Sequence, residues 1–261
     1  MQVLLLTDFS NNAKKMQEYA LNFLGDETAH FTLFHTIKPC KTSSCESLCS
    51  ANRQKKLDIE FNNLSQKLKP SQSLSKVFVK NNLVDAVRCY IEKAKVDMII
   101  MGGKGNTSDK TKQFGKNTYD IVTKIRCPIL VVHEDSVVKI PGSIVFPLDY
   151  STSVQSKYFN IVRQLDFWKN INLSILEVPN KKLHNHLFQK INKQQISKAF
   201  HGINYDFKTI KLQDDKGICE KCLGADIIMF MAKNLTISNQ IFQQRDKNPI
   251  SQKSPLLVLH A

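Results

Sequence analysis

Residues 3–10 read VLLLTDFS, and residues 144–151 read IVFPLDYS. Each is an apolar run that ends in aspartate, an aromatic residue and serine. Three further pairs recur in the same order: FTLFHTI (31–37) with LSILEVP (173–179), VDMIIM (96–101) with ADIIMF (225–230), and CPILVVH (127–133) with SPLLVLH (254–260). Four ordered matches, offset by 127 to 142 residues, indicate that one domain is present twice.

The repeated apolar runs are five to seven residues long, which predicts strands buried on both faces of a parallel sheet. Segments with helical periodicity separate them, at 11–24, 54–68, 83–93 and 118–125. This alternation predicts an α/β fold: two tandem doubly wound parallel-sheet domains with five strands each. Pro141 and Gly142 interrupt the pattern, so we divide the chain into domains at 1–139 and 140–261. The Ser-rich stretch 38–53 is expected to be a loop or a frayed helix start.

Composition excludes several classes of protein. No run approaches the roughly 18 uncharged apolar residues of a membrane helix, and the N-terminus lacks the features of a signal peptide, so we expect a cytoplasmic protein. The net charge of +14 is spread evenly, with no basic tail or arm, which makes nucleic-acid binding an unlikely function. Seven cysteines without an export signal favour reduced thiols. Cys219 and Cys222 have CxxC spacing, but nothing at zinc-finger distance completes a metal site.

The segment after the fourth strand has the composition of a phosphate-binding loop. MGGKG at 101–105 is followed, after nine residues, by GKNT at 115–118 and a helix. Glycines let backbone N–H groups approach an anion, and a helix N-terminus supplies unpaired donors and a positive dipole end. Nearby cations and side-chain donors are Lys104, Lys110, Lys112, Lys116, Asn117 and Thr118. Thr7 and Asp8 should meet this segment, because ligands of such sheets bind at the switch point between the first and fourth strands. The alternative is that the glycines only turn the chain.

The spacing Gly102-x2-Gly105-x9-Gly115 resembles the signature of the universal stress protein family, together with Asp8, His35 and the final strand CPILVV. The resemblance covers the whole chain as a tandem pair and implies an adenine-nucleotide alpha-hydrolase-like fold that binds ATP, with Mg, in the first domain. The residues that it implies for adenosine are Thr7, Asp8, Thr36, Met101 and Gly102. Those that it implies for the phosphates are Gly105, Gly115, Lys116 and Asn117. Lys116 stands where the family has Ser or Thr.

The second domain departs further from the pattern. MAKN at 231–234 replaces the first glycines, and Gln243 and Gln244 fall near the third. The interval from Asp97 to Pro128 is 31 residues, and that from Asp226 to Pro255 is 29, so we expect a loop two residues shorter. We interpret this half as a degenerate, non-binding partner. The apolar final strands, 129–132 and 256–259, need covering and are expected to pair as an intramolecular pseudo-dimer. A homodimer of whole chains remains open.

Catalysis has little support in the sequence. There is no GxxxxGK motif, no kinase signature and no serine-hydrolase elbow. Asp8 is the one carboxylate expected to be buried near the phosphates, and His35 is expected to be a packing or turn residue. We therefore predict a non-enzymatic stress-response protein that binds ATP or a related adenine nucleotide and acts on an unknown protein client. A slow ATPase and a nucleotide-free interaction module are the alternatives.

Overall fold

The computed structural model describes residues 1–39, 43–105, 114–180, 186–209, 218, 222, 224–245 and 254–260. The elements of the first half are β1 (Gln2–Leu6), α1 (Asn11–Leu24), β2 (Ala29–Ile37), α2 (Ser43–Ser65), β3 (Gln72–Lys80), α3 (Leu83–Ala94), β4 (Met98–Gly102), α4 (Lys116–Lys124) and β5 (Ile129–Val132). Those of the second half are β6 (Ser143–Leu148), η1 (Ser156–Phe159), α5 (Asn160–Arg163), η2 (Asp166–Asn170), β7 (Asn172–Glu177), α6 (His186–Ala199), β8 (Asn204–Thr209), β9 (Ile227–Met231), α8 (Leu235–Arg245) and β10 (Leu256–Leu259).

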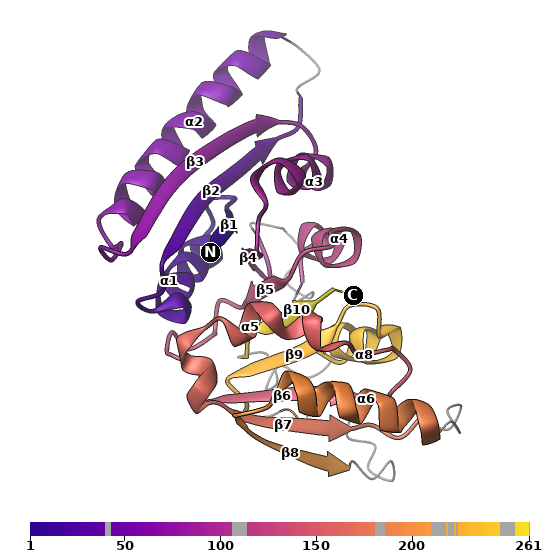
Figure 1. The fold of residues 1–261 in the computed structure, drawn as a ribbon. Coiled ribbons are helices and arrows are strands. Elements are labelled where there is room, and N and C mark those ends of the chain that lie inside the picture. The colour runs from indigo at the N-terminus through magenta and orange to yellow at the C-terminus, as the bar shows by residue number, and fades with distance from the viewer. Residues whose placement is uncertain are drawn as a thin grey trace.

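The ten strands form one continuous sheet, in the order β3-β2-β1-β4-β5-β10-β9-β6-β7-β8 (Figure 1). Strands within each half are parallel, and each half has the strand order of a doubly wound unit. The halves meet where β5 and β10 pair antiparallel, with Leu257 opposite Leu130. The predicted fold class and the predicted pairing of the two final strands are therefore confirmed.

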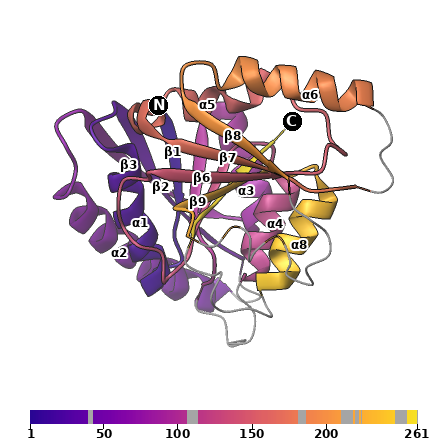
Figure 2. The same ribbon diagram turned by 90° about the horizontal axis from the view of Figure 1, so that it is seen from below.

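Helices cover both faces of the sheet (Figures 1 and 2). Successive strand residues point to opposite faces, so Leu5 lies in the core beneath α1 and α2, whereas Leu4 lies in the core beneath α3 and α4. Helices α5 and α6 of the second half extend the first of these cores, and α8 extends the second. Each core therefore runs through both halves of the chain.

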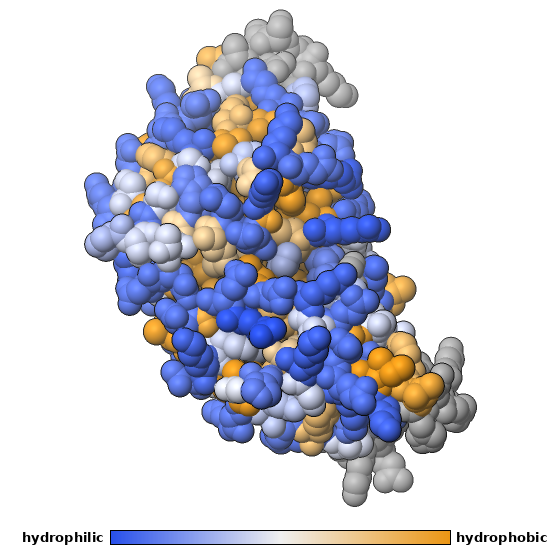
Figure 3. Space-filling view, viewed as in Figure 1, coloured by the Kyte–Doolittle hydropathy of each residue, from blue (hydrophilic) through white to orange (hydrophobic). Residues whose placement is uncertain are grey.

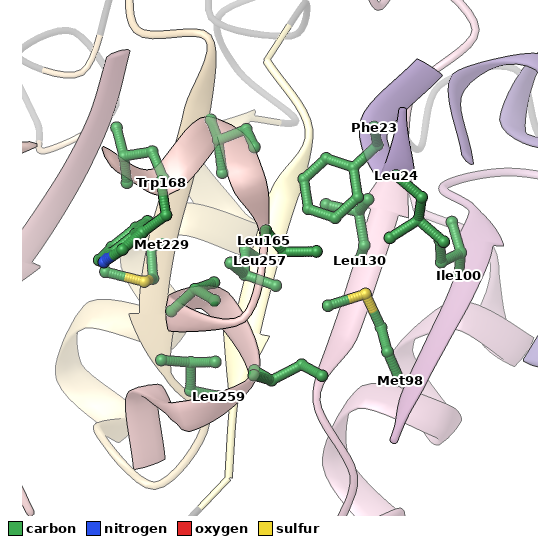
Figure 4. Close-up of a cluster of buried hydrophobic side chains, with 14 of the residues drawn as sticks. Phe23, Leu24, Met98, Ile100, Leu130, Leu165, Trp168, Met229, Leu257 and Leu259 are labelled. Atoms are coloured by element: carbon green, nitrogen blue, oxygen red, sulfur yellow. The ribbon is translucent and has the colours of Figure 1, made fainter. Parts of the chain in front are cut away.

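The seam between the halves is apolar and closely packed. Figure 4 shows Phe23 of α1 on one side and Trp168 of η2 on the other, with Leu130 and Leu257 of the paired strands between them. The ring of Phe23 also lies 5.1 Å from that of Phe167, in an edge-to-face arrangement. Side chains of both halves thus share a single interior at this face of the sheet.

Helix boundaries follow the sequence prediction except in α2. Helix α1 begins and ends where it was predicted, with the Ser10 hydroxyl accepting a hydrogen bond from the Ala13 N–H at 3.1 Å as an N-cap. Helix α2 begins at Ser43, so the Ser-rich stretch, which we expected to be a loop or a frayed helix start, is largely helical. That stretch contains no glycine or proline after Pro39, and serine costs a helix little. Buried Leu57 and Leu64 then dock the helix on the sheet.

Hydrophilic residues predominate on the face of the molecule shown in Figure 3, with hydrophobic residues scattered among them. In the described part of the chain, no helix combines the length and the apolar character that crossing a membrane would require.

Candidate functional site

A cavity of about 560 Å³ opens at the carboxyl ends of β1, β2 and β4. Its position is the switch point of the first half, where Leu6 of β1 lies beside Met101 of β4. All nine candidate residues from the sequence line this cavity: Thr7, Asp8, Thr36, Met101, Gly102, Gly105, Gly115, Lys116 and Asn117. They come from four separate segments of the chain, which the fold brings to one place.

The turn after β1 holds Asp8 at the edge of the cavity. The Asp8 Oδ1 atom accepts a hydrogen bond from the Ser10 N–H at 3.0 Å, and Thr7 Oγ1 accepts one from the Phe9 N–H at 3.1 Å. Phe9 itself has a φ of 65°, a left-handed conformation that a bulky residue seldom adopts. These side-chain bonds to the backbone hold the turn in that conformation and fix Asp8 beside the glycine segment.

Glycine allows the chain to pass close to Asp8. A Cβ atom at Gly105 would overlap Asp8 Oδ2, so with any larger residue the aspartate side chain or the backbone would have to move away. Asn12 of α1 supports the preceding residue, because its side-chain amide donates to the carbonyl of Lys104 at 2.8 Å. The backbone at Lys104 and Gly105 thus lies beside Asp8 and is fixed there by the hydrogen bond from Asn12.

The N-terminus of α4 forms another wall of the cavity and has backbone N–H groups that are available as hydrogen-bond donors. Gly115 is the N-cap and supplies no side-chain hydrogen bond, and its N–H donates to the carbonyl of Gly103 at 2.9 Å. The structure gives the N–H groups of Lys116 and Asn117 no acceptor among the described residues, as expected for the first turn of a helix. Such a helix end attracts anions.

Thr118 does not offer the free hydroxyl that the sequence suggested. Its Oγ1 atom donates to the carbonyls of Gly102 and Gly103, at 3.1 and 3.0 Å, and the residue is buried. The hydroxyl therefore links α4 to the end of β4. Because it is already hydrogen-bonded there, it is not available as a donor to a ligand.

Cations outnumber carboxylates around the cavity. Lys38, Arg53, Lys104 and Lys116 line it, whereas Asp8 is the acidic residue in the lining. Arg53 lies on α2 with its guanidinium 5.9 Å from the centroid of the Phe9 ring. The sequence analysis missed Arg53 because it placed this residue in a loop. Lys110 and Lys112 lie outside the described residues.

A second carboxylate, Glu60 of α2, lies behind the cavity wall and was also missed. It is 7% exposed and accepts hydrogen bonds from the Thr7 hydroxyl and the Gln17 amide. Burial raises its pKa above the ordinary glutamate value. Asp8, which we expected to be the buried carboxylate, is only partly buried. The spacing of Leu57, Glu60 and Leu64 on one helical face was the signal that could have found it.

His35 packs as expected, although it lies within β2 and not after it. Its ring centroid is 4.3 Å from that of Phe9, and its Nδ1–H donates to the carbonyl of Thr7 at 2.7 Å. Burial lowers the pKa of this histidine, so the imidazole is neutral at physiological pH. Among the described residues, no group of three or more His, Cys, Asp or Glu side chains is arranged to hold a metal ion.

The family model for the universal stress protein family matches residues 1–133. The chain belongs to the universal stress protein family. No curated protein matches it.

Solved structures show the fold of this universal stress protein over its full length. A universal stress protein from Archaeoglobus fulgidus is 15% identical, with a TM-score of 0.70, over 98% of this chain and 97% of that one. A putative universal stress protein from Pseudomonas aeruginosa is 12% identical, with a TM-score of 0.54, over 99% and 92% of the two chains. A family member from Arabidopsis thaliana, solved with AMP bound, is 13% identical and covers 51% of this chain and 91% of its own, with a TM-score of 0.38.

The second half of this universal stress protein keeps the turn but closes the space beside it. Tyr150 has a φ of 59°, and the Ser151 N–H donates to Asp149 Oδ1 at 2.9 Å, as in the first half. Here, however, the buried Asn234 side chain donates to Asp149 Oδ1 at 2.6 Å, and Asn180 donates to Oδ2 at 3.3 Å. In the second half, asparagine side chains thus lie against the aspartate. In the first half, the residue that lies beside the aspartate is Gly105, which has no side chain.

The alignment that we drew through Gln243 and Gln244 is wrong. These residues lie near the C-terminal end of α8, and the connection from β9 to α8 is residues 232–234 alone. The corresponding connection in the first half is residues 103–115. Asn234 begins α8 early, with its side-chain oxygen accepting from the Ile237 N–H at 3.1 Å. The interval between Asp226 and Pro255 concealed this difference, because residues 246–254 separate α8 from Pro255, whereas residues 125–127 alone separate α4 from Pro128.

Proposed function

We propose that the first half binds an adenine nucleotide, with ATP as the leading candidate, in the cavity at the carboxyl ends of β1 and β4. One observation carries this proposal: nine residues from four segments line a single cavity, and one wall of it holds N–H groups of α4 that have no acceptor among the described residues. A volume of about 560 Å³ lies within the range of small-molecule sites. The excess of cations in the lining favours a ligand with several negative charges.

Each part of the cavity suits one part of the nucleotide. Thr7 and Asp8 would contact adenosine, Thr36 would contact adenine through its backbone, and Met101 and Gly102 would flank the ribose. The phosphates would lie between two segments that carry few or no side chains, Gly105 on one side and Gly115 on the other. Lys116 and Asn117 would complete the phosphate site, and Mg²⁺ would enter with the phosphates.

We propose that the nucleotide is a ligand and not a substrate. Phosphoryl transfer needs groups that position Mg²⁺ and the attacking water. The two carboxylates at this site already have structural partners, since Asp8 holds the turn at Ser10 and Glu60 holds Thr7 and Gln17. Bound nucleotide would instead stabilise the first half by mass action and favour the conformation that a protein client recognises. On this basis the chain acts as a non-enzymatic stress-response protein.

The test is calorimetric titration with Mg-ATP, with a thermal shift as a second readout. The variant Gly115→Val should lose binding and keep the fold. A Cβ atom at this position meets its nearest neighbour, Gly105 N, at 3.8 Å, which is an ordinary van der Waals contact, and the methyl groups of valine would add bulk beside Gly105 where the proposal places the phosphates. Gly142→Val, in the linker before β6, is the matched control and should bind ATP as the natural protein does. Absence of both heat and thermal shift up to millimolar nucleotide would contradict the proposal.

A further inference from the structure

One side chain of the second half, that of Phe242, packs on two aromatic residues that flank the first turn of α4, which faces the cavity. Phe242 of α8 lies with its ring 4.8 Å from that of Phe114 and 5.9 Å from that of Tyr119, both edge-to-face. Phe114 comes immediately before Gly115, and Tyr119 lies one turn into α4. The segment 115–118 is therefore bracketed by two rings that pack on Phe242, and it contains Lys116 and Asn117, whose N–H groups have no acceptor in the described part of the chain.

Phe242 is itself held firmly. It is 8% exposed and packs edge-to-face on Phe230 of β9, with ring centroids 6.1 Å apart. Strand β9 lies next to β10, which pairs with β5 of the first half. The ring thus packs from α8 against a strand of the sheet that both halves share.

Phe114 connects this contact to the glycine backbone. A Cβ atom at Gly103 would lie 3.6 Å from the Phe114 ring and 3.3 Å from that of His133, so the three residues are in close contact. The carbonyl of Gly103 in turn accepts the hydrogen bonds from the Gly115 N–H and the Thr118 hydroxyl. A change in the position of the Phe114 ring would therefore alter how Gly115 and the first turn of α4 face the cavity.

We propose that Phe242 is a positioning residue for the phosphate end of the nucleotide site. The second half, in which Asn234 contacts Asp149, would then serve the first half as a fixed support for the start of α4. This inference rests on the proposed function, since it concerns the affinity of the same cavity. It adds that the second half takes part in binding without touching the ligand.

The experiment compares ATP with adenosine, which lacks the phosphates. Phe242→Leu keeps an apolar side chain and removes the ring contacts, and we expect the Kd for ATP to rise on the order of threefold to tenfold, the range that one aromatic contact can account for. The Kd for adenosine should remain within a factor of about two of the natural protein's value, because Phe242 contacts only the α4 side of the cavity. A rise in the Kd for ATP without a matching rise in the Kd for adenosine is a result that general destabilisation of the protein would not produce.

Phe159→Leu is the matched control. Phe159 is fully buried in the second half, and its ring contacts are with Phe146 and Phe200, in the core on the face of the sheet opposite to α4. This variant should lower the melting temperature and leave the ratio of the two Kd values unchanged. Phe114→Leu should reproduce the effect of Phe242→Leu, and the double variant should add little, because both remove the same contact.

Two outcomes would overturn the inference while leaving the proposed function intact: unchanged ATP affinity in Phe242→Leu, or an equal loss of affinity for ATP and adenosine. A natural protein that binds neither ligand would instead overturn the proposed function and the inference with it.

Discussion

The same three residue types, aspartate, an aromatic residue and serine, form the same strained turn in both halves, yet the two aspartates have different surroundings. Asp8 is partly exposed beside a cavity, whereas Asp149 is 2% exposed and accepts hydrogen bonds from Ser151, Asn180 and Asn234. A buried carboxylate with several donors contributes mainly to stability, and a partly exposed one beside a cavity is available to a ligand.

The pair Asp8→Asn and Asp149→Asn separates these roles. We expect Asp8→Asn to weaken ATP binding by roughly tenfold, the effect of losing one charge-assisted hydrogen bond, with a small loss of stability. Asp149→Asn should leave ATP affinity unchanged and lower the free energy of unfolding by about 1–3 kcal/mol, since one carboxylate oxygen that accepts a hydrogen bond would become an NH2 group that faces a donor. Calorimetric titration and urea unfolding of both variants provide the comparison. Equal effects of the two substitutions on affinity would argue against a ligand site specific to the first half.

Lys116 replaces a hydroxyl residue of the family pattern with a cation at the start of α4. A positive charge at a helix N-terminus is unfavourable unless an anion neutralises it. The residue is exposed and lines the cavity, so its ammonium group is available to phosphates. The substitution thus exchanges a short, directional donor for a longer and more flexible one.

At the level of elements, the sequence predicts what depends on local pattern. Unbroken apolar runs identified the eight inner strands, because a strand covered on both faces needs apolar residues at every position. The two edge strands, β3 and β8, have mixed, partly exposed sequences and were not located by such a run. Ser10 and the periodicity after it identified the limits of α1. The nine candidate residues could be placed together because parallel strands end at a common edge of the sheet.

The elements that the sequence predicted badly are those whose limits depend on contacts elsewhere. Helix α2 has a weakly amphipathic sequence and gains its stability from docking on β2 and β3, which no local pattern shows. Arg53 and Glu60 were missed with it. The short connection before α8 was missed because the cap at Asn234 also serves Asp149, a contact between residues 85 positions apart.

The docking of α2 through Glu60 predicts a pH dependence. A carboxyl group whose pKa is higher in the folded protein than in the unfolded chain binds its proton more tightly when folded, so its contribution to stability is complete below the unfolded pKa and is lost as pH rises through the folded one. Glu60→Gln, which keeps a neutral acceptor, should remove this part of the pH dependence just above the ordinary glutamate pKa. Urea unfolding of both proteins across that range measures it.

The neighbouring groups Lys14 and Asp8 act on Glu60 in opposite directions, so the variant Lys14→Gln is a useful control that should raise the Glu60 pKa further. If the free energy of unfolding varied with pH in the same way in the natural protein and in Glu60→Gln, this carboxyl would not titrate in the pH range just above the ordinary glutamate pKa.

At the level of the whole molecule, the shared core across β5 and β10 predicts that the two halves unfold together. Leu257 is fully buried opposite Leu130, and truncation of such a leucine costs about 2–5 kcal/mol. We expect Leu257→Ala to lower the melting temperature and to keep a single transition. Fluorescence of Trp168, the one tryptophan in the chain, reports on the second half, and loss of ATP binding reports on the first.

These two signals should change at the same temperature in the natural protein and in Leu257→Ala. The control is Ile196→Ala, which changes a buried residue of α6 away from the seam. In this variant too, the Trp168 signal and ATP binding should be lost at the same temperature. Loss of Trp168 signal before loss of ATP binding would show two units that unfold independently.

The antiparallel junction has a directional consequence. Because β10 runs against β5, the carboxyl ends of these two paired strands lie at opposite edges of the sheet. The cavity lies at the carboxyl ends of β1 and β4, whereas the Asp149 turn follows the carboxyl end of β6, on the other side of this junction. A macromolecule that covered the carboxyl end of β5 would therefore leave that of β10 uncovered.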